Sequence, residues 1–295
     1  MKAKICVTLA LLAVPVLAHA ETPWWATPTL QIGLPADLSR NVTQGEDVAR
    51  NEVYPTVPDS VPEIIRKGRN GNGICMGCHL PSGLGQPQSA PLAGLPEAYF
   101  IRTMHDLKGG DRGAYRPNMV DFAKGLADDE IKAAATYYAS LKSAPWIKVQ
   151  ESDTAPKLFV ATREIPAAVP GGGDMPLGIR IVELRTDLVK PYHPPGPAFI
   201  AYVPKGSVAR GAALVKGGGG KTVACTTCHG ANLLGAGDVP AIAGRSALHN
   251  ARQLFEFQDG TRHGAAAEPM KAVVAHLGEA DIVAISAYLA SRPPV

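Results

Sequence analysis

The pentapeptide Cys75-Met76-Gly77-Cys78-His79 returns 150 residues later as Cys225-Thr226-Thr227-Cys228-His229. Cys-x-x-Cys-His is typical of c-type haem attachment, because two thiols at this spacing can add to the two vinyl groups of one porphyrin while the adjoining histidine binds the iron. Cys-x-x-Cys alone would also suit half of a zinc site or a thioredoxin-like redox pair. The histidine in both copies favours two covalently bound haem c groups.

The first twenty residues predict export. Lys2 and Lys4 precede an apolar run over 5–17, and Ala18-His19-Ala20 provides a cleavage site before Glu21, as in a secretory signal peptide. No later stretch contains the ~20 consecutive apolar residues of a transmembrane helix. We therefore expect a cleavable signal peptide at 1–20 and a periplasmic mature protein with no transmembrane anchor.

The mature chain has no cysteine left for a disulfide. Cleavage removes Cys6, and the other four cysteines all lie in the two motifs. Exported proteins often rely on disulfides, so the haem groups themselves are expected to be the covalent stabilising elements. The net charge of +3 falls to +1 without the two leader lysines, and this excludes the dense basic surface that nucleic-acid binding requires.

The similarity between the two halves extends well beyond the cysteines. Under an offset of 150 residues, Leu92-Ala93-Gly94 falls on Ile242-Ala243-Gly244, and after one inserted residue Met119 falls on Met270. Register kept over roughly 65 residues is the signature of an internal repeat. It predicts a tandem duplication of one small unit.

Apolar spacing and capping residues predict a mostly α fold. The expected helices cover Ser60 to Lys67, Glu97 to Leu107, Asp128 to Leu141, Val208 to Val215, Ala247 to Phe257 and Glu279 to Ser291. Between the repeats lies a long segment rich in Pro and Gly, with possible short strands at 179–184 and 198–203. The expected organisation is a signal peptide at 1–20, an N-terminal arm at 21–59, a first domain at 60–141, a connecting segment at 142–205 and a second domain at 206–295.

Each haem iron needs a second axial ligand besides His79 or His229. Met119 and Met270 are the candidates, because they follow their histidines by 40 and 41 residues at matched points of the repeat. A fixed methionine raises the reduction potential and closes the iron to substrate, as electron transfer requires. The rivals in the first half, Met104 and His105, align with Leu254 and Phe255, which cannot bind iron.

Other residues are candidates for contacts with the haems. Arg112 and Arg262 occupy matched positions and are expected to neutralise haem propionates, with Arg102 and Arg252 as weaker candidates. Pro91 and Pro240, 12 and 11 residues after the histidines, are expected to offer a backbone carbonyl to the histidine ring N–H. Four histidines without a counterpart are assigned to packing or surface roles: His193, His249, His263 and His276.

These motifs resemble those of dihaem class I cytochromes c of the cytochrome c4 type. The second half matches best, through Val239-Pro240-Ala241-Ile242-Ala243-Gly244, Arg252-Gln253-Leu254, Gly260-Thr261-Arg262, Met270 and Tyr288-Leu289-Ala290-Ser291. The first half departs by placing Pro91 one position later and Leu107 where the pattern has Phe. The resemblance covers about 145 of 275 mature residues, and it implies two class I cytochrome c domains whose His/Met haems pass electrons between periplasmic or membrane proteins.

The predicted function is therefore electron transfer without catalytic residues of its own. The expected partners are a dehydrogenase as donor, of which the chain could be the cytochrome subunit, and an oxidase or another cytochrome as acceptor. The alternative is a dihaem enzyme such as a cytochrome c peroxidase, with one exchangeable axial ligand; the matched methionines argue against it. A thiosulfate-oxidising enzyme with a cysteine ligand is disfavoured because no mature cysteine is spare.

Overall fold

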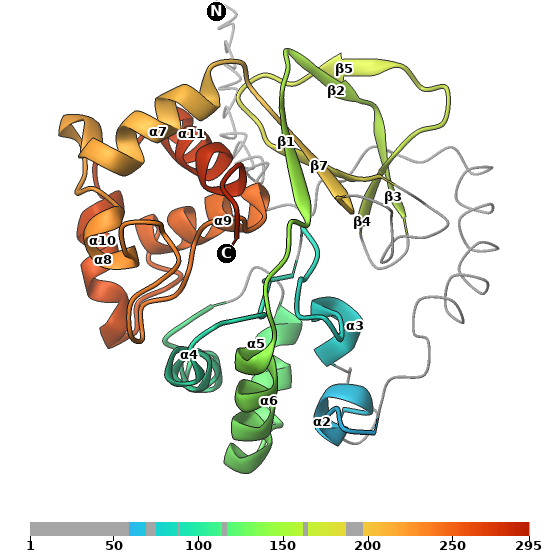
Figure 1. Ribbon diagram of the computed structural model, residues 1–295, viewed down its shortest axis with the longest axis vertical. Coiled ribbons are helices and arrows are strands. Elements are labelled where there is room, and N and C mark those ends of the chain that lie inside the picture. The colour runs from blue at the N-terminus through green and yellow to red at the C-terminus, as the bar shows by residue number, and fades with distance from the viewer. Residues whose placement is uncertain are drawn as a thin grey trace, which may run out of the picture.

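The structure is a computed structural model that describes residues 59–68, 75–87, 89–113, 117–161, 165–186 and 197–294. The predicted signal peptide and nearly all of the predicted N-terminal arm lie outside these residues. Three parts are visible in Figure 1: an N-terminal helical unit, a C-terminal helical unit, and a group of strands between them in sequence.

The two helical units contain all six predicted helices. The N-terminal unit consists of α2 (Glu63–Arg66), α3 (Cys75–His79), α4 (Glu97–Gly109), α5 (Pro117–Lys124) and α6 (Asp128–Ser140). The C-terminal unit consists of α7 (Ser207–Gly217), η2 (Gly218–Gly220), α8 (Thr226–His229), α9 (Ala247–Gln258), η3 (Ala265–Ala267), α10 (Glu268–Val274) and α11 (Glu279–Ala290). The predicted helices are confirmed, with α2 shorter than expected.

The last helix of each unit begins in the same way. The Glu130 carboxylate accepts a hydrogen bond from the Ala127 N–H at 2.8 Å, and the Asp281 carboxylate accepts one from the Gly278 N–H at 3.1 Å. An acidic side chain at the third helical position thus satisfies a backbone donor that the helix itself leaves free. Both helices then turn an apolar face inward, where Ile131 and Ile282 are fully buried.

Close packing in the C-terminal unit depends on one glycine. Helices α7 and α11 cross tightly (Figure 1), and a Cβ atom on Gly211 would lie 2.0 Å from the Ala284 carbonyl oxygen. Only glycine allows two helix backbones to approach this closely. The crossing buries Val215 and Ile285 in a core that also receives Ile181 of the strand group.

The strands form a folded region, which we call the sheet segment (residues 147–161, 165–186 and 197–203). They are β1 (Ile147–Glu151), β2 (Thr154–Pro156), β3 (Leu158–Ala161), β4 (Ile165–Ala168), β5 (Asp174–Pro176), β6 (Val182–Arg185) and β7 (Phe199–Val203). The main sheet has the order β1-β7-β6, with β1 parallel and β6 antiparallel to β7; β2 pairs with β5 and β3 with β4. The two predicted strands are confirmed, but the other five were not expected from the sequence.

The sheet segment contacts both helical units. Trp146, just before β1, donates its indole N–H to the Gly85 carbonyl of the N-terminal unit at 3.0 Å. Glu183 of β6, only 1% exposed, accepts hydrogen bonds from the Ser246 hydroxyl at 2.7 Å and the Leu248 N–H at 3.0 Å. The segment therefore joins the two units through buried hydrogen bonds as well as through the chain.

The helical units also meet each other directly. Arg112 and Arg262, which fall on each other under the offset of 150 residues, form an antiparallel β-bridge. The flanking hydrogen bonds run from Gly113 N to Thr261 O at 2.7 Å and from His263 N to Asp111 O at 2.9 Å. Each bond is the counterpart of the other under the repeat offset, so the contact is related to itself by a local pseudo-two-fold axis.

Membrane-spanning potential is limited in the part of the chain that the structure describes. No single helix there is long and apolar enough to cross a bilayer. One pair, Ala265–Val274 with Glu279–Ala290, reaches the required length and composition only when taken together, across a bend of 111°.

Candidate haem-binding site

The first Cys-x-x-Cys-His motif forms the short helix α3, and the second forms α8 together with Cys225, the residue just before that helix. In each motif the second cysteine, Cys78 or Cys228, is exposed, whereas the first is partly buried. Burial raises the pKa of the Cys75 thiol to about 12 and that of the Cys225 thiol to about 11. The cysteines of each motif therefore stand at the boundary between solvent and the interior, beside the cavity described below.

The two histidines have the same hydrogen-bond geometry. His79 Nδ1 lies 2.8 Å from the Ala90 carbonyl oxygen, and His229 Nδ1 lies 2.8 Å from the Pro240 carbonyl oxygen. A carbonyl only accepts, so Nδ1 carries the proton and Nε2 is the nitrogen available to a metal. Burial lowers the pKa of both rings, which favours the neutral form that binds metals.

The prediction for Pro91 is wrong. The acceptor in the first half is Ala90, which lies 11 residues after its histidine, as Pro240 does in the second half. The loop keeps its length, and therefore the position of the carbonyl, whereas the proline has moved by one residue. The Pro91 carbonyl instead accepts a hydrogen bond from Arg245 of the other unit at 2.5 Å.

One continuous cavity of about 920 Å³ connects the two motifs. His79 and His229 both line it, together with a cysteine pair from each motif. Its walls are largely apolar and come from both units: Leu92, Phe100 and Leu126 on one side, and Phe257, Ile285 and Leu289 on the other. Thiols, histidines with a fixed tautomer and apolar walls are the features that a covalently attached haem requires.

Met119 and Met270 both line this cavity. Each is the third residue of a short helix, α5 or α10, that has a proline in its first turn. Proline is tolerated there because its missing N–H has no partner to lose. The rival Met104 lines the cavity too, but it is 6% exposed and packed in the core of the N-terminal unit.

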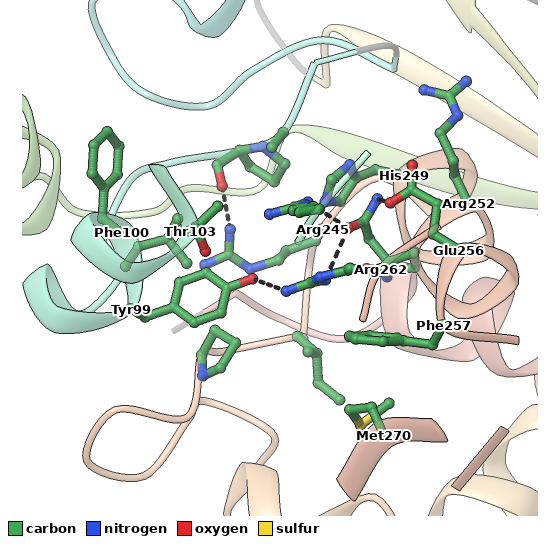
Figure 2. Close-up of a pocket in the computed structure, with 18 of the residues that line it drawn as sticks. Tyr99, Phe100, Thr103, Arg245, His249, Arg252, Glu256, Phe257, Arg262 and Met270 are labelled. Atoms are coloured by element: carbon green, nitrogen blue, oxygen red, sulfur yellow. Dashed lines mark hydrogen bonds between the residues drawn. The ribbon is translucent and has the colours of Figure 1, made fainter. Parts of the chain in front are cut away.

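Arginines gather where the two units face each other across the cavity (Figure 2). Gln253 Oε1 accepts hydrogen bonds from Arg112 Nη2 at 2.6 Å and from Arg262 Nη1 at 2.9 Å. Arg262 also donates to the Tyr99 hydroxyl at 3.0 Å. Gln253 thus holds side by side two like charges that would otherwise repel each other.

Positive charge dominates this part of the cavity. Arg112, Arg245, Arg252 and Arg262 all line it, while Glu256 is the buried carboxylate among them. Burial alone would raise the pKa of Tyr99, but the charges of Arg262 and Arg112 outweigh it and lower this pKa to about 7. Burial and the same arginines hold the pKa of His249 well below its ordinary value. Such an excess of positive charge suits the carboxylates of a haem.

Several residues of the site were missed by the sequence analysis. Tyr99, Gln253, Arg245 and Asn250 all line the cavity. The Asn250 Nδ2 group is buried without a hydrogen-bond partner among the described residues. Only Gln253 lay within a motif quoted for the family resemblance; the other three differ from their counterparts in the other half, so no repeated pattern marks them.

Comparison with known proteins agrees with this geometry. Residues 208–293 match the family model described as Cytochrome c. The thiosulfate dehydrogenase electron acceptor of Thiomonas intermedia (strain K12) is 28% identical over 222 residues, which cover 74% of this chain and 78% of that protein. Cytochrome c4 of Pseudomonas aeruginosa is 26% identical over 228 residues, which cover 75% and 85% of the two chains.

A solved structure is similar as well. The thiosulfate dehydrogenase TsdBA from Marichromatium purpuratum superposes with a TM-score of 0.53 at 26% identity over 79% of this chain. The matched region is 39% of the length of that dehydrogenase chain.

Residues 208–293 thus resemble the cytochrome c family, and the cavity with its two motifs fits covalently attached haem c. The resemblance to cytochrome c4 is confirmed, and the relatives that share it are named as a cytochrome and as an electron acceptor.

Proposed function

We propose that this protein is a periplasmic dihaem cytochrome that passes electrons through two haems c, one ligated by His79 and Met119 and the other by His229 and Met270. The single cavity that both motifs line is the observation that carries the proposal. Each haem iron would cycle between Fe(III) and Fe(II). The chain's part is to hold both cofactors by thiols, orient each histidine, and exclude water with apolar walls.

Matched backbone geometry supports a tandem duplication of residues 60–141 and 206–295. Leu80 and Leu233 both adopt left-handed backbone, with φ of 65° and 64°. Their counterparts under the repeat offset, Gly230 and Gly83, have positive φ too, at 81° and 68°, although the ψ of Gly230, 156°, lies outside the left-handed helical region. Because this conformation costs leucine about 1–2 kcal/mol, its retention at both positions favours descent of the two halves from one unit.

We further propose that a dehydrogenase supplies the electrons. One relative is named for accepting electrons from thiosulfate dehydrogenase, and a thiosulfate dehydrogenase structure superposes on 79% of this chain. We expect a thiosulfate dehydrogenase together with thiosulfate to reduce the purified protein. Thiosulfate alone should not reduce it. No reduction by this pair would exclude that donor and direct the search to other periplasmic dehydrogenases.

Haem content and spectrum test the main proposal. The purified protein should contain two covalently bound haems per chain, should begin at Glu21, and should be found in the periplasmic fraction. Its oxidised spectrum should show only low-spin iron with the weak red band of methionine-to-iron bonding. One haem per chain would contradict the proposal. A high-spin signal at either haem, or rapid peroxide turnover, would instead favour the peroxidase alternative.

A further inference from the structure

Arg245 is a buried cation that binds both helical units. It lies just before α9, is 8% exposed and lines the cavity (Figure 2). Its Nε–H donates to the Ala241 carbonyl of its own unit at 2.5 Å, and its Nη1 donates to the Pro91 carbonyl of the N-terminal unit at 2.5 Å. Burial lowers the pKa of the guanidinium to about 10, so the group keeps its charge at neutral pH. One side chain therefore fastens a loop of each unit with charge-assisted hydrogen bonds.

The two carbonyls that Arg245 binds occupy matched positions of the repeat. Pro91 falls on Ala241 under the offset of 150 residues. The residue after each carbonyl makes the same backbone hydrogen bond in both halves, from Leu92 N to Gly83 O at 2.7 Å and from Ile242 N to Leu233 O at 2.9 Å. Arg245 thus contacts the same point of two loops that have matching hydrogen bonds.

These carbonyls directly follow the ones that orient the histidines. The Ala90 carbonyl, one residue before the first of them, lies 2.8 Å from His79 Nδ1. The Pro240 carbonyl, one residue before the second, lies 2.8 Å from His229 Nδ1. Because the peptide units are planar and only two soft dihedral angles separate neighbouring carbonyls, a bond that fixes one restricts the direction of the other. Arg245 therefore acts one residue away from the histidine acceptor in each half.

The counterpart of Arg245 in the first half has no such role. Under the repeat offset Arg245 corresponds to Leu95, which is 7% exposed and packed in the core of the N-terminal unit. A leucine side chain cannot donate a hydrogen bond. One guanidinium at the junction of the units thus serves both loops.

We propose that Arg245 is a positioning residue that fastens the two histidine-orienting loops to each other, so that a single side chain fixes the direction of both axial histidines. This inference rests on the proposed function, in which His79 and His229 each bind a haem iron. The hydrogen bond donated by Nδ1 makes a histidine a more basic ligand, and a more basic ligand favours Fe(III) over Fe(II). Loosening of a loop weakens that bond and raises the reduction potential of the haem concerned.

Arg245→Lys tests the inference with the positive charge retained. Lysine is a point charge without the planar fork of arginine, so it should hold the two loops less firmly. In NMR spectra of the reduced holoprotein, exchange of the Nδ1 protons of both His79 and His229 should become at least about tenfold faster. In a potentiometric titration, the potentials of both haems should shift upward together.

Arg180 offers a matched control in the sheet segment. It also donates to two backbone carbonyls, of Leu177 at 3.0 Å and of Pro176 at 2.6 Å, but it does not line the cavity. Arg180→Lys should therefore change neither the exchange of the histidine protons nor the two potentials.

A response of only one haem to Arg245→Lys would overturn the inference, and so would unchanged exchange rates and potentials. Equal acceleration at the His263 amide, in the bridge between Arg112 and Arg262, would show a general loosening and would overturn it too. If the variant does not fold, the unaltered protein still provides a test. Its Arg245 Nε proton should be protected from exchange, and rapid exchange there would contradict the bond to Ala241. A haem count below two per chain in the unaltered protein would instead contradict the proposed function.

Discussion

Asp281 shows how single residues stabilise the C-terminal unit. Its side chain is 2% exposed and accepts hydrogen bonds from Lys221 at 2.7 Å, from Arg210 and from the Gly278 N–H at 3.1 Å. Burial alone would raise the pKa of Asp281, but these hydrogen bonds outweigh it and lower the pKa from 3.8 to about 2. The ionised carboxylate therefore favours the folded state.

The acid stability of the protein should reflect this carboxylate. Because folding lowers its pKa, its contribution is complete above about pH 4 and is lost as the pH falls toward 2. We expect about 1 kcal/mol, since its basic partners are about half exposed and solvent screens them. Asp281→Asn should lower the free energy of unfolding by this amount at pH 7 and by less at pH 2.5, in denaturant titrations of the holoprotein. Glu268→Gln, at an exposed ion pair, should have no comparable effect.

Met270 decides the chemistry of the second iron if it is the axial ligand. Met270→Ala should lower the potential of one haem, because a methionine ligand raises it, and should open that iron to cyanide or carbon monoxide. The red band should fall to about half, since the other haem keeps Met119. Met175→Ala, in the small core of the sheet segment, should change neither property. An unaltered titration curve for Met270→Ala would remove Met270 as a ligand.

At the residue scale, the side chains that the sequence predicts to hold the haems line one cavity, whereas one of the backbone groups predicted to orient them was misplaced. Cysteines and histidines are fixed by the motif itself. The carbonyl that accepts from His79 was placed one residue too late, at Pro91, because hydrogen bonding there depends on loop length and not on residue type. Tyr99 and Gln253 both accept hydrogen bonds from Arg262, and the bond to Tyr99 joins the two units, which periodicity within one unit does not reveal.

At the scale of elements, helices were predictable and most strands were not. The helices have apolar spacing and acidic first turns, which are local signals. Strands β2 and β5 contain three residues each and pair across 20 positions of sequence, so neither shows alternation on its own. The parallel pairing of β1 with β7 joins residues 52 positions apart, which no local pattern indicates.

Strand β6 is connected to helix α9 through the buried carboxylate of Glu183. This carboxylate accepts from Ser246 and Leu248 at the start of α9, and burial raises its pKa. Glu183→Ala should lower the free energy of unfolding by about 2–4 kcal/mol, because two buried donors lose a charged acceptor. Glu183→Gln, which keeps one acceptor oxygen, should cost less. Equal losses in denaturant titrations of the two variants would contradict a hydrogen-bonding role.

At the scale of the whole molecule, the sequence predicted two similar units but not their relative orientation. A repeat shows which residues correspond and says nothing of which surfaces touch. The structure places Arg112 against Arg262, so that the contact pairs a position with its own counterpart. It also turns the connecting segment into a folded region that touches both units.

Gly113 can be used to test how closely the two units approach each other at the Arg112–Arg262 bridge. A Cβ atom there would lie 2.6 Å from Thr261 Cγ2, so Gly113→Ala should open the bridge at a cost of about 1–3 kcal/mol. Hydrogen exchange at the His263 amide, which donates to Asp111, should become at least about tenfold faster. Gly109→Ala is the control, because its Cβ would meet nothing closer than 3.8 Å. Equal protection of His263 in both variants would show that the bridge tolerates a methyl group.

The bridge between matched positions has a consequence for the direction of electron flow. In a homodimer built around such an axis the two sites are identical, and an electron has no preferred side. Here both sites belong to one chain, so each can change without the other. Under the offset of 150 residues, Asn250 corresponds to Phe100, His249 to Tyr99 and Gln253 to Thr103, so the residue type differs at each of these positions. A chain with this internal pseudo-symmetry can therefore have two sites of different reduction potential, so that electron transfer between them is favourable in one direction.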